Sequence, residues 1–156
     1  TMRKTLYTLF AVLGLCLFAS CSDDKENDSP LAQQLEGEWH LVSWVGSASV
    51  DFDTYISFTA GGQFEIYQRI ENVGYEKYTG TYQLNDNIFS GRYSNNTPLK
   101  SPSYEISFDE AGNTLTMTSE PSLGEVSVYT RTAIPGSIKG GAVVVKSSRS
   151  AGRLPL

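Results

Sequence analysis

Clusters of turn-forming residues interrupt the chain at short, regular intervals. Seven such clusters, rich in Gly, Asn, Asp and Ser, separate eight runs of residues, at 46–49, 60–62, 72–74, 85–87, 95–98, 110–113 and 121–124. Gly, Asn and Asp tolerate the positive φ angles that hairpin turns require. Little room is left between the clusters for long helices, so this pattern predicts an all-β chain.

The runs between the turns alternate between apolar and polar residues. Ile56 and Phe58 alternate with Ser57 and Thr59, and comparable patterns recur in 64–67, 77–84, 104–108 and 114–118. A period of two with β-branched and aromatic residues is typical of half-buried strands. Eight short sequential strands predict an antiparallel up-and-down barrel, preceded by a short helical turn at 31–35. The alternative is a β-sandwich.

The connections between the expected strands alternate in length. The odd-numbered connections (46–52, 71–74, 95–102 and 120–124) are longer than the even-numbered ones (60–62, 85–87 and 110–113). In an up-and-down barrel, alternate connections lie at the same end. One end is therefore expected to be closed by tight turns, while the other has room for a mouth.

The first 20 residues have the order of a secretory signal peptide. Arg3 and Lys4 precede an apolar stretch of about 14 residues, Leu6 to Ala19. A membrane-spanning helix needs ~20 apolar residues, so this stretch is too short to serve as one. Residues 1–20 are therefore expected to be removed from the mature protein.

The end of this segment, Phe18-Ala19-Ser20-Cys21, resembles the bacterial lipobox. The resemblance implies that Cys21 becomes the first mature residue and carries lipid, which anchors the protein to a membrane; the alternative is a plain signal peptide with an incidental cysteine. Residues 21–30 are polar and acidic, and we expect them to form a solvated tether. An acidic cluster after the lipidated cysteine resembles the surface-export signal of Bacteroides-type lipoproteins. We therefore expect an outer-membrane lipoprotein on the cell surface, or alternatively one that faces the periplasm.

The start of the first expected strand carries a second resemblance. Leu35-Glu36-Gly37-Glu38-Trp39-His40-Leu41 contains the G-x-W of lipocalins in an L-x-G-x-W-x-L frame. With Tyr78-x-Gly80-x-Tyr82 and Tyr129-x-Arg131, residues 31–135 resemble the lipocalin-like lipoproteins of Bacteroides-type bacteria. The resemblance implies a closed barrel end where Arg131 packs over Trp39, next to Gly37. It also implies a binding protein for a small molecule.

Composition argues against several kinds of function. Residues 30–134 hold 13 acidic and five basic side chains, which disfavours nucleic-acid binding. His40 is the only histidine, and Cys16 would leave with the signal peptide, so we expect no metal site and no cofactor. No nucleophile has an evident base; Asp51 and Asp53 could share a face, but a polar loop is the simpler interpretation. We therefore expect a monomer without enzymatic activity.

The aromatic residues suggest where a ligand would lie. Four of them fall near the longer connections: Phe52, Tyr78, Tyr93 and Tyr104. Tyrosine offers an apolar face with one polar group, which suits a small hydrophobic or amphipathic ligand. Large interior side chains can instead simply fill a small barrel. The alternative function is therefore a surface interaction or structural module whose barrel holds no ligand.

The last segment, residues 136–156, differs from the rest of the chain. It contains Lys139, Lys146, Arg149 and Arg153, without any acidic residue. It has neither a helical nor a clear strand pattern. We expect it to be a disordered basic tail outside the barrel domain.

Overall fold

The computed structural model describes residues 29–45, 51–71, 73–146 and 156. Cys21, the expected signal peptide and most of the expected tether lie outside these residues. None of the helices in the described ranges is long and apolar enough to cross a membrane.

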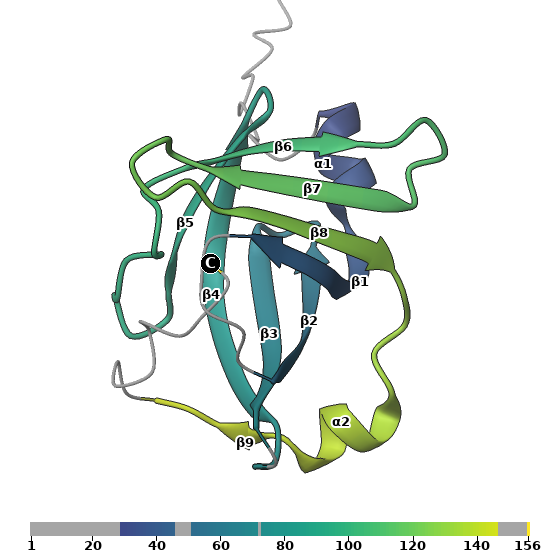
Figure 1. The fold of residues 1–156 in the computed structure, drawn as a ribbon, viewed down its shortest axis with the longest axis vertical. Helices are drawn as coiled ribbons and strands as arrows, with labels where there is room; N and C mark the ends of the chain where they lie inside the picture. The colour runs from purple at the N-terminus through teal and green to yellow at the C-terminus, as the bar shows by residue number, and fades with distance from the viewer. Residues whose placement is uncertain (1–28, 46–50, 72, 147–155) are drawn as a thin grey trace, which may run out of the picture.

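Eight antiparallel strands form a closed barrel (Figure 1). They are β1 (Gly37–Val45), β2 (Phe52–Thr59), β3 (Gln63–Ile70), β4 (Glu76–Asn85), β5 (Ile88–Tyr93), β6 (Tyr104–Phe108), β7 (Thr114–Ser119) and β8 (Val126–Arg131). Each strand pairs with the next, and β8 pairs with β1, so the barrel has no open edge between its first and last strands. The predicted up-and-down barrel is confirmed, and the sandwich alternative is wrong.

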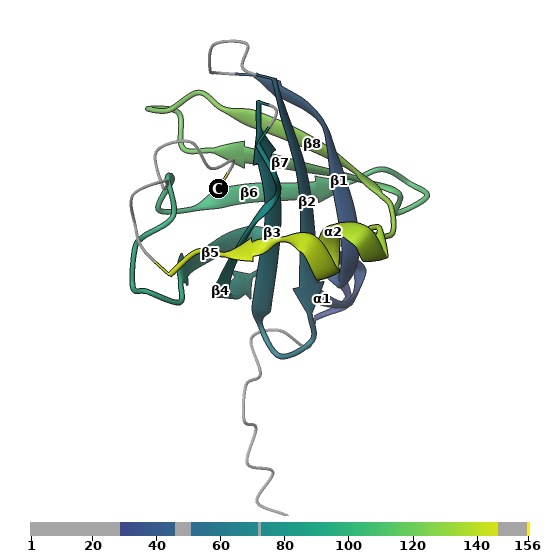
Figure 2. The same cartoon turned by 90° about the horizontal axis from the view of Figure 1, so that it is seen from below.

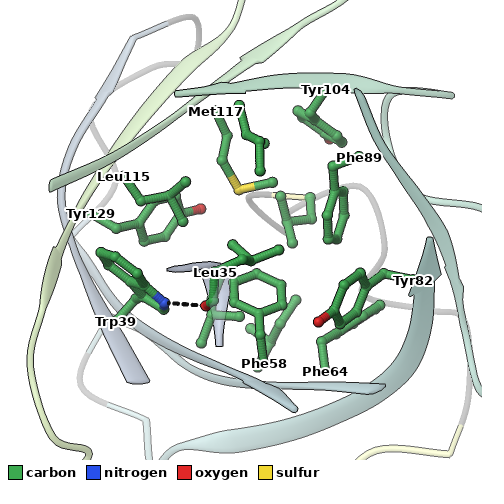
Figure 3. Packing of buried hydrophobic residues seen from close by; sticks show 14 of the residues in the cluster. Leu35, Trp39, Phe58, Phe64, Tyr82, Phe89, Tyr104, Leu115, Met117 and Tyr129 are labelled. Carbon is green, nitrogen blue, oxygen red and sulfur yellow. Dashed lines mark hydrogen bonds between the residues drawn. The ribbon is translucent and has the colours of Figure 1, made fainter. Parts of the chain in front are cut away.

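The alternation of apolar residues decides which side chains enter the barrel. Along β2, Ile56 and Phe58 are buried while Ser57 and Tyr55 are only half-buried. Along β8, Ser127 and Tyr129 are buried, with more exposed residues on either side. The inward apolar side chains belong to one core cluster, part of which is drawn in Figure 3.

A short helix, α1 (Pro30–Leu35), precedes the first strand. The Ser29 side chain accepts a hydrogen bond from Ala32 N at 3.1 Å, which caps the helix, and Pro30 has the φ angle that a first helical turn requires. The helix therefore begins one residue before the predicted 31–35. Ala32 and Leu35 are buried in the core cluster, so α1 packs against the barrel.

A β-bulge in β1 changes which residues face inward. The register with β8 shifts between Leu41 and Ser43, so Trp44 lies opposite the buried Ser127. Simple alternation from Trp39 and Leu41 would have turned Ser43 inward instead. One extra residue in the strand reverses the facing of everything after it.

The C-terminal segment corrects the prediction of a disordered tail. Residues Gly136–Gly141 form the helix α2, and Val143–Val144 form a ninth strand, β9, parallel to β4. Val143 N and Val145 N donate to Tyr75 O and Lys77 O, both at 2.9 Å, and Lys139 pairs with Glu38. The segment thus crosses the outside of the barrel wall (Figure 2). Residues 147–155 lie outside the described part.

Candidate ligand-binding interior

Trp39 closes one end of the barrel. Its side chain is fully buried, and its Nε1 donates a hydrogen bond to Leu35 O at 2.9 Å (Figure 3). The guanidinium carbon of Arg131 lies 4.2 Å from the centre of the indole ring, and Phe108 packs against the ring at 5.7 Å. Trp39 therefore joins α1, β6 and β8 at the start of the first strand.

Arg131 ties the surrounding backbone together at the same end. Nη1 and Nη2 donate to Glu36 O and Gln34 O at 2.8 and 2.6 Å, and Nε donates to Gly112 O at 3.2 Å. Gly37 has a φ of 118°, and a Cβ there would lie only 2.7 Å from Arg131 Nη1. The structure therefore brings Gly37, Trp39 and Arg131 together, in the arrangement that the resemblance implied.

Aromatic side chains fill the barrel next to this end. The rings of Tyr82 and Phe89 stack at 5.2 Å, and Phe58 meets both of them edge-on. Tyr82 OH donates to Thr59 O at 3.0 Å, at the end of β2. Gly80 leaves space for the neighbouring Phe64 ring, because a Cβ there would lie 2.2 Å from Phe64. The half of the interior near the tight turns is a packed structural core.

Two of the four predicted ligand residues, Tyr78 and Tyr93, meet in the other half of the interior, whereas the Tyr104 ring packs on Phe89 at 6.4 Å and only its hydroxyl reaches the β5–β6 connection. Tyr78, Tyr93 and Tyr104 are at most 5% exposed, and Tyr93 contacts Tyr78 with ring centres 6.2 Å apart. Phe52 is only half-buried and packs instead against Trp44 at 4.9 Å. The tyrosines therefore line the interior, while Phe52 and Trp44 lie together near the β1–β2 connection.

Each of these tyrosine hydroxyls has a polar partner. Tyr78 OH donates to Glu76 Oε2 at 2.6 Å, Tyr93 OH donates to Leu156 O at 2.8 Å, and Tyr104 OH accepts from Ser101 N at 3.2 Å. Burial raises the pKa of Tyr104 to about 12 and also raises the pKa of Tyr93. The two phenols therefore stay protonated near neutral pH and remain able to donate.

Polar side chains also face inward among these tyrosines, and the sequence analysis did not single them out. They are at most 5% exposed: Thr54, Gln68, Ser119 and Ser127. Thr54 and Gln68 face each other across β2 and β3 and share the inward parity of Ile56 and Ile66. Strand alternation could have indicated these residues, because it places the polar Thr54 and Gln68 on the buried face of their strands.

An ion pair lies beside Trp44 at the mouth, the end with the longer connections. Lys100 pairs with Glu125, whose side chain is 5% exposed, and Lys100 Nζ lies 4.8 Å from the centre of the Trp44 ring. Ser101 Oγ accepts from Glu120 N at 3.2 Å, which joins the β5–β6 and β7–β8 connections. Both charges lie in connections rather than strands, so alternation gave no indication of their burial.

His40 faces outward, as expected from its position beside Trp39. Its Nε2 lies 2.6 Å from Asp53 Oδ1, its ring stacks on Tyr55 at 4.3 Å, and Tyr75 OH donates to the other Asp53 oxygen. Burial alone raises the pKa of Asp53, but the hydrogen bonds with Tyr75 and His40 outweigh it and hold this pKa below its usual value. Within the described ranges, no group of His, Cys, Asp and Glu could hold a metal ion.

The barrel and its sealed end define a class of proteins that is typically used for binding rather than catalysis. Residues 35–117 match the sequence profile of the lipocalin-like domain family, which covers more than half of the chain. The chain therefore belongs to the lipocalin-like domain family. No curated protein matches the chain.

Proposed function

We propose that this chain is a lipid-anchored binding protein that holds a small amphipathic or hydrophobic molecule in the mouth half of its barrel. The observation that carries this proposal is a change of polarity along individual strands. Moving from the tight turns toward the mouth, the inward residues run from Phe58 through Ile56 to Thr54 on β2, from Phe64 through Ile66 to Gln68 on β3, and from Leu115 through Met117 to Ser119 on β7. On β2 and β3 the half-buried Phe52 and Ile70 follow at the same parity, so the polar residues form a band below an apolar rim.

A core that only stabilises the fold has no use for this change. Burying a hydroxyl or an amide costs free energy unless it finds a partner, whereas an apolar residue of similar size contributes to stability. An interior that is apolar at depth and polar nearer the mouth matches a ligand with an apolar body and a polar end. Tyr78, Tyr93 and Tyr104 lie in the polar half and suit such a ligand through their apolar rings and single hydroxyls.

A fluorescent hydrophobic dye tests this function directly. The full chain should bind the dye, and Tyr104→Trp should weaken binding by adding bulk in the mouth half. Tyr82→Trp makes the same change near the closed end and should leave dye affinity unchanged, provided that thermal melts show both variants folded. No binding by the wild type, or equal losses in both variants, would contradict the proposal.

We also propose lipid attachment at Cys21 and an outer-membrane location. The support is the sequence pattern Phe18-Ala19-Ser20-Cys21 followed by an acidic stretch. Ser29, the helix cap, follows Cys21 by eight positions, and eight extended residue steps reach at most ~29 Å. Because α1 packs at the closed end, an anchor at Cys21 would hold that end toward the membrane and leave the mouth accessible.

Detergent phase partition tests the anchor, using the chain with its leader in a bacterial host. The wild type should enter the detergent phase, and Cys21→Ala should remain in the aqueous phase. Protease treatment of intact cells then distinguishes a surface location, where the protein is digested, from a periplasm-facing one. Equal partition of the two forms would contradict lipidation.

A second function, a surface interaction module without a small ligand, is favoured by the rim of the mouth. Three exposed apolar residues lie on or beside its connections: Val45, Val73 and Leu123. Replacing Val45 and Val73 with Ser should then abolish capture of a partner from the host envelope while dye binding stays unchanged. If the substitutions leave capture unaffected, this second function is excluded.

A further inference from the structure

Two buried hydrogen-bonding groups near the mouth have no partner among the described residues, namely Trp44 Nε1 and Thr54 Oγ1. Thr54 is fully buried on β2. Trp44 is half-buried at the end of β1, but its indole nitrogen is buried. Burying a polar group without a partner costs free energy, so neither group helps to stabilise the fold.

Both residues adjoin the side chain of Phe52. The Trp44 ring meets the Phe52 ring edge-on, with ring centres 4.9 Å apart. Phe52 precedes Thr54 by two positions on β2, so the two side chains are neighbours on the inward face of the strand. Trp44 and Phe52 therefore lie at the rim, and Thr54 lies in the polar band directly below them. A ligand that enters past Phe52 passes Trp44 and reaches Thr54.

These groups are hydrogen-bond donors. An indole N–H can only donate, and a threonine hydroxyl can donate as well as accept. A further donor, Lys100 Nζ, lies 4.8 Å from the centre of the Trp44 ring. The ligand group that fits this part of the mouth must therefore bring an acceptor oxygen.

The charges beside Trp44 indicate which kind of oxygen fits. Lys100 already pairs with Glu125, whose side chain is 5% exposed. A ligand carboxylate would lose hydration and compete with Glu125 for one ammonium group. A ligand ammonium could not accept a hydrogen bond from Trp44 and would be repelled by Lys100. An uncharged oxygen avoids both costs.

We propose that Trp44 and Thr54 bind the polar end of the ligand, and that this end is an uncharged oxygen, as in a ketone, an ester or an alcohol. The oxygen accepts hydrogen bonds from Trp44 Nε1 and from the Thr54 hydroxyl. This inference rests on the proposed function and narrows its ligand from any amphipathic molecule to one with an uncharged oxygen at its polar end.

NMR of the isotope-labelled full chain tests the contact with Trp44 directly. The chain contains two tryptophans, and the Trp39 indole N–H already donates to Leu35 O, so its signal is an internal control. Trp44→Phe assigns the other indole signal by removing it. At pH 7, 2-hexanone should move the Trp44 signal downfield and leave the Trp39 signal in place. Hexane, which offers no acceptor, should not produce this downfield shift.

Affinities of four six-carbon probes then test the chemistry of the polar end. The probe 2-hexanone has a neutral acceptor, hexanoate is an anion, hexylamine is a cation at pH 7, and hexane has no polar group. By NMR titration, 2-hexanone should bind at least about tenfold more tightly than either charged probe.

Thr54→Val separates a role in binding from a role in stability. This variant should bind 2-hexanone about three- to tenfold more weakly, the effect of losing one neutral hydrogen bond, and should bind hexane no more weakly than the wild type. Its melting temperature should equal or exceed that of the wild type, because the hydroxyl has no partner among the described residues. The matched control is Thr118→Val, an exposed position on β7, which should leave all affinities unchanged.

The outcomes separate this inference from the proposed function. Four results would each overturn it: a Trp44 signal that does not move at saturating 2-hexanone, unchanged ketone affinity in Thr54→Val, a much lower melting temperature of that variant, or tighter binding of a charged probe. If any of these occurs, or no probe binds, while the dye still binds and Tyr104→Trp weakens it, the acceptor assignment fails and the binding function stands. If neither the dye nor any probe binds, both fail.

Discussion

At the closed end of the barrel, Trp39 is held between α1, Phe108 and Arg131, and the neighbouring inward side chains are almost all apolar or aromatic. At the mouth, the same strands turn Thr54, Gln68 and Ser119 inward, beside tyrosines and the Lys100–Glu125 pair. Strand pairing is continuous between the two regions. The contrast teaches that one barrel wall can carry a structural core and a polar interior, because each strand changes the character of its inward face along its length.

The largest expected loss of stability follows from removing the Trp39 side chain at the closed end. Trp39→Ala removes a fully buried indole with its hydrogen bond to Leu35 O, and truncation of a large core aromatic costs about 3–5 kcal/mol. A domain of this size has a total stability of about 5–15 kcal/mol, so this variant should unfold at much lower urea concentration.

The matched change at the mouth is Trp44→Ala. Trp44 is only half-buried and packs mainly on Phe52 and Lys100, so its loss should cost less than about 2 kcal/mol. Urea denaturation of both variants checks the comparison. Equal losses would show that the two ends contribute alike.

The next effect concerns the buried charges of the mouth. Lys100→Met leaves Glu125 buried without its ammonium partner, which should cost about 3 kcal/mol. The double variant Lys100→Met/Glu125→Leu should recover most of that loss, because no buried charge remains. A single variant as stable as the wild type would show that the pair is effectively solvated.

A moderate loss of stability is expected when a side chain is added at Gly80, near the middle of the barrel. Gly80→Ala should cost about 1–3 kcal/mol, because the new Cβ would lie 2.2 Å from Phe64 Cζ and 2.4 Å from Arg92 O. Gly74→Ala is the control, since a Cβ at Gly74 meets no atom within 4 Å, and it should change stability by less than about 0.5 kcal/mol. Thermal melts of the two variants check the difference.

The smallest expected change in stability comes from Asp53 on the outer wall of the barrel, and it depends on pH. The pKa of Asp53 is lowered in the folded state, because its hydrogen bonds with Tyr75 and His40 outweigh the effect of burial. Because this pKa is lower in the folded state, ionised Asp53 stabilises the fold at pH values above the unfolded pKa of about 3.9. This stabilisation is lost as the pH falls through the folded pKa. Asp53→Asn should therefore be less stable than the wild type at pH 7, and the gap should narrow at pH 2 to 3. A gap that does not change with pH would contradict this assignment.

Much of the fold was predictable because its signals are local. The turn clusters and the alternation around Ile56, Phe58 and Tyr82 are properties of neighbouring residues, and they define strands and inward faces without knowledge of distant partners. The closed end was predictable for another reason, namely that Gly37-Glu38-Trp39 and Tyr129-x-Arg131 resemble lipocalins. The structure brings these residues together.

The features that were missed depend on contacts between distant segments. The bulge that turns Trp44 inward is visible only in the register of β1 with β8, and the Lys100–Glu125 pair joins two connections. The residues of β9 lack a strand pattern of their own and become a strand by pairing with Glu76 and Lys77 of β4. Leu156 is buried and bonds to Tyr93, which is 63 positions away in sequence, so no local pattern could have indicated its burial.

Native mass spectrometry of the protein purified from its own host tests most directly the claim that the mouth half holds a ligand while the closed half does not. The wild type should carry a small-molecule adduct, Tyr104→Trp should lose it, and folded Tyr82→Trp should retain it. An unliganded wild type, or an adduct that survives Tyr104→Trp and disappears in Tyr82→Trp, would contradict the assignment of the two halves.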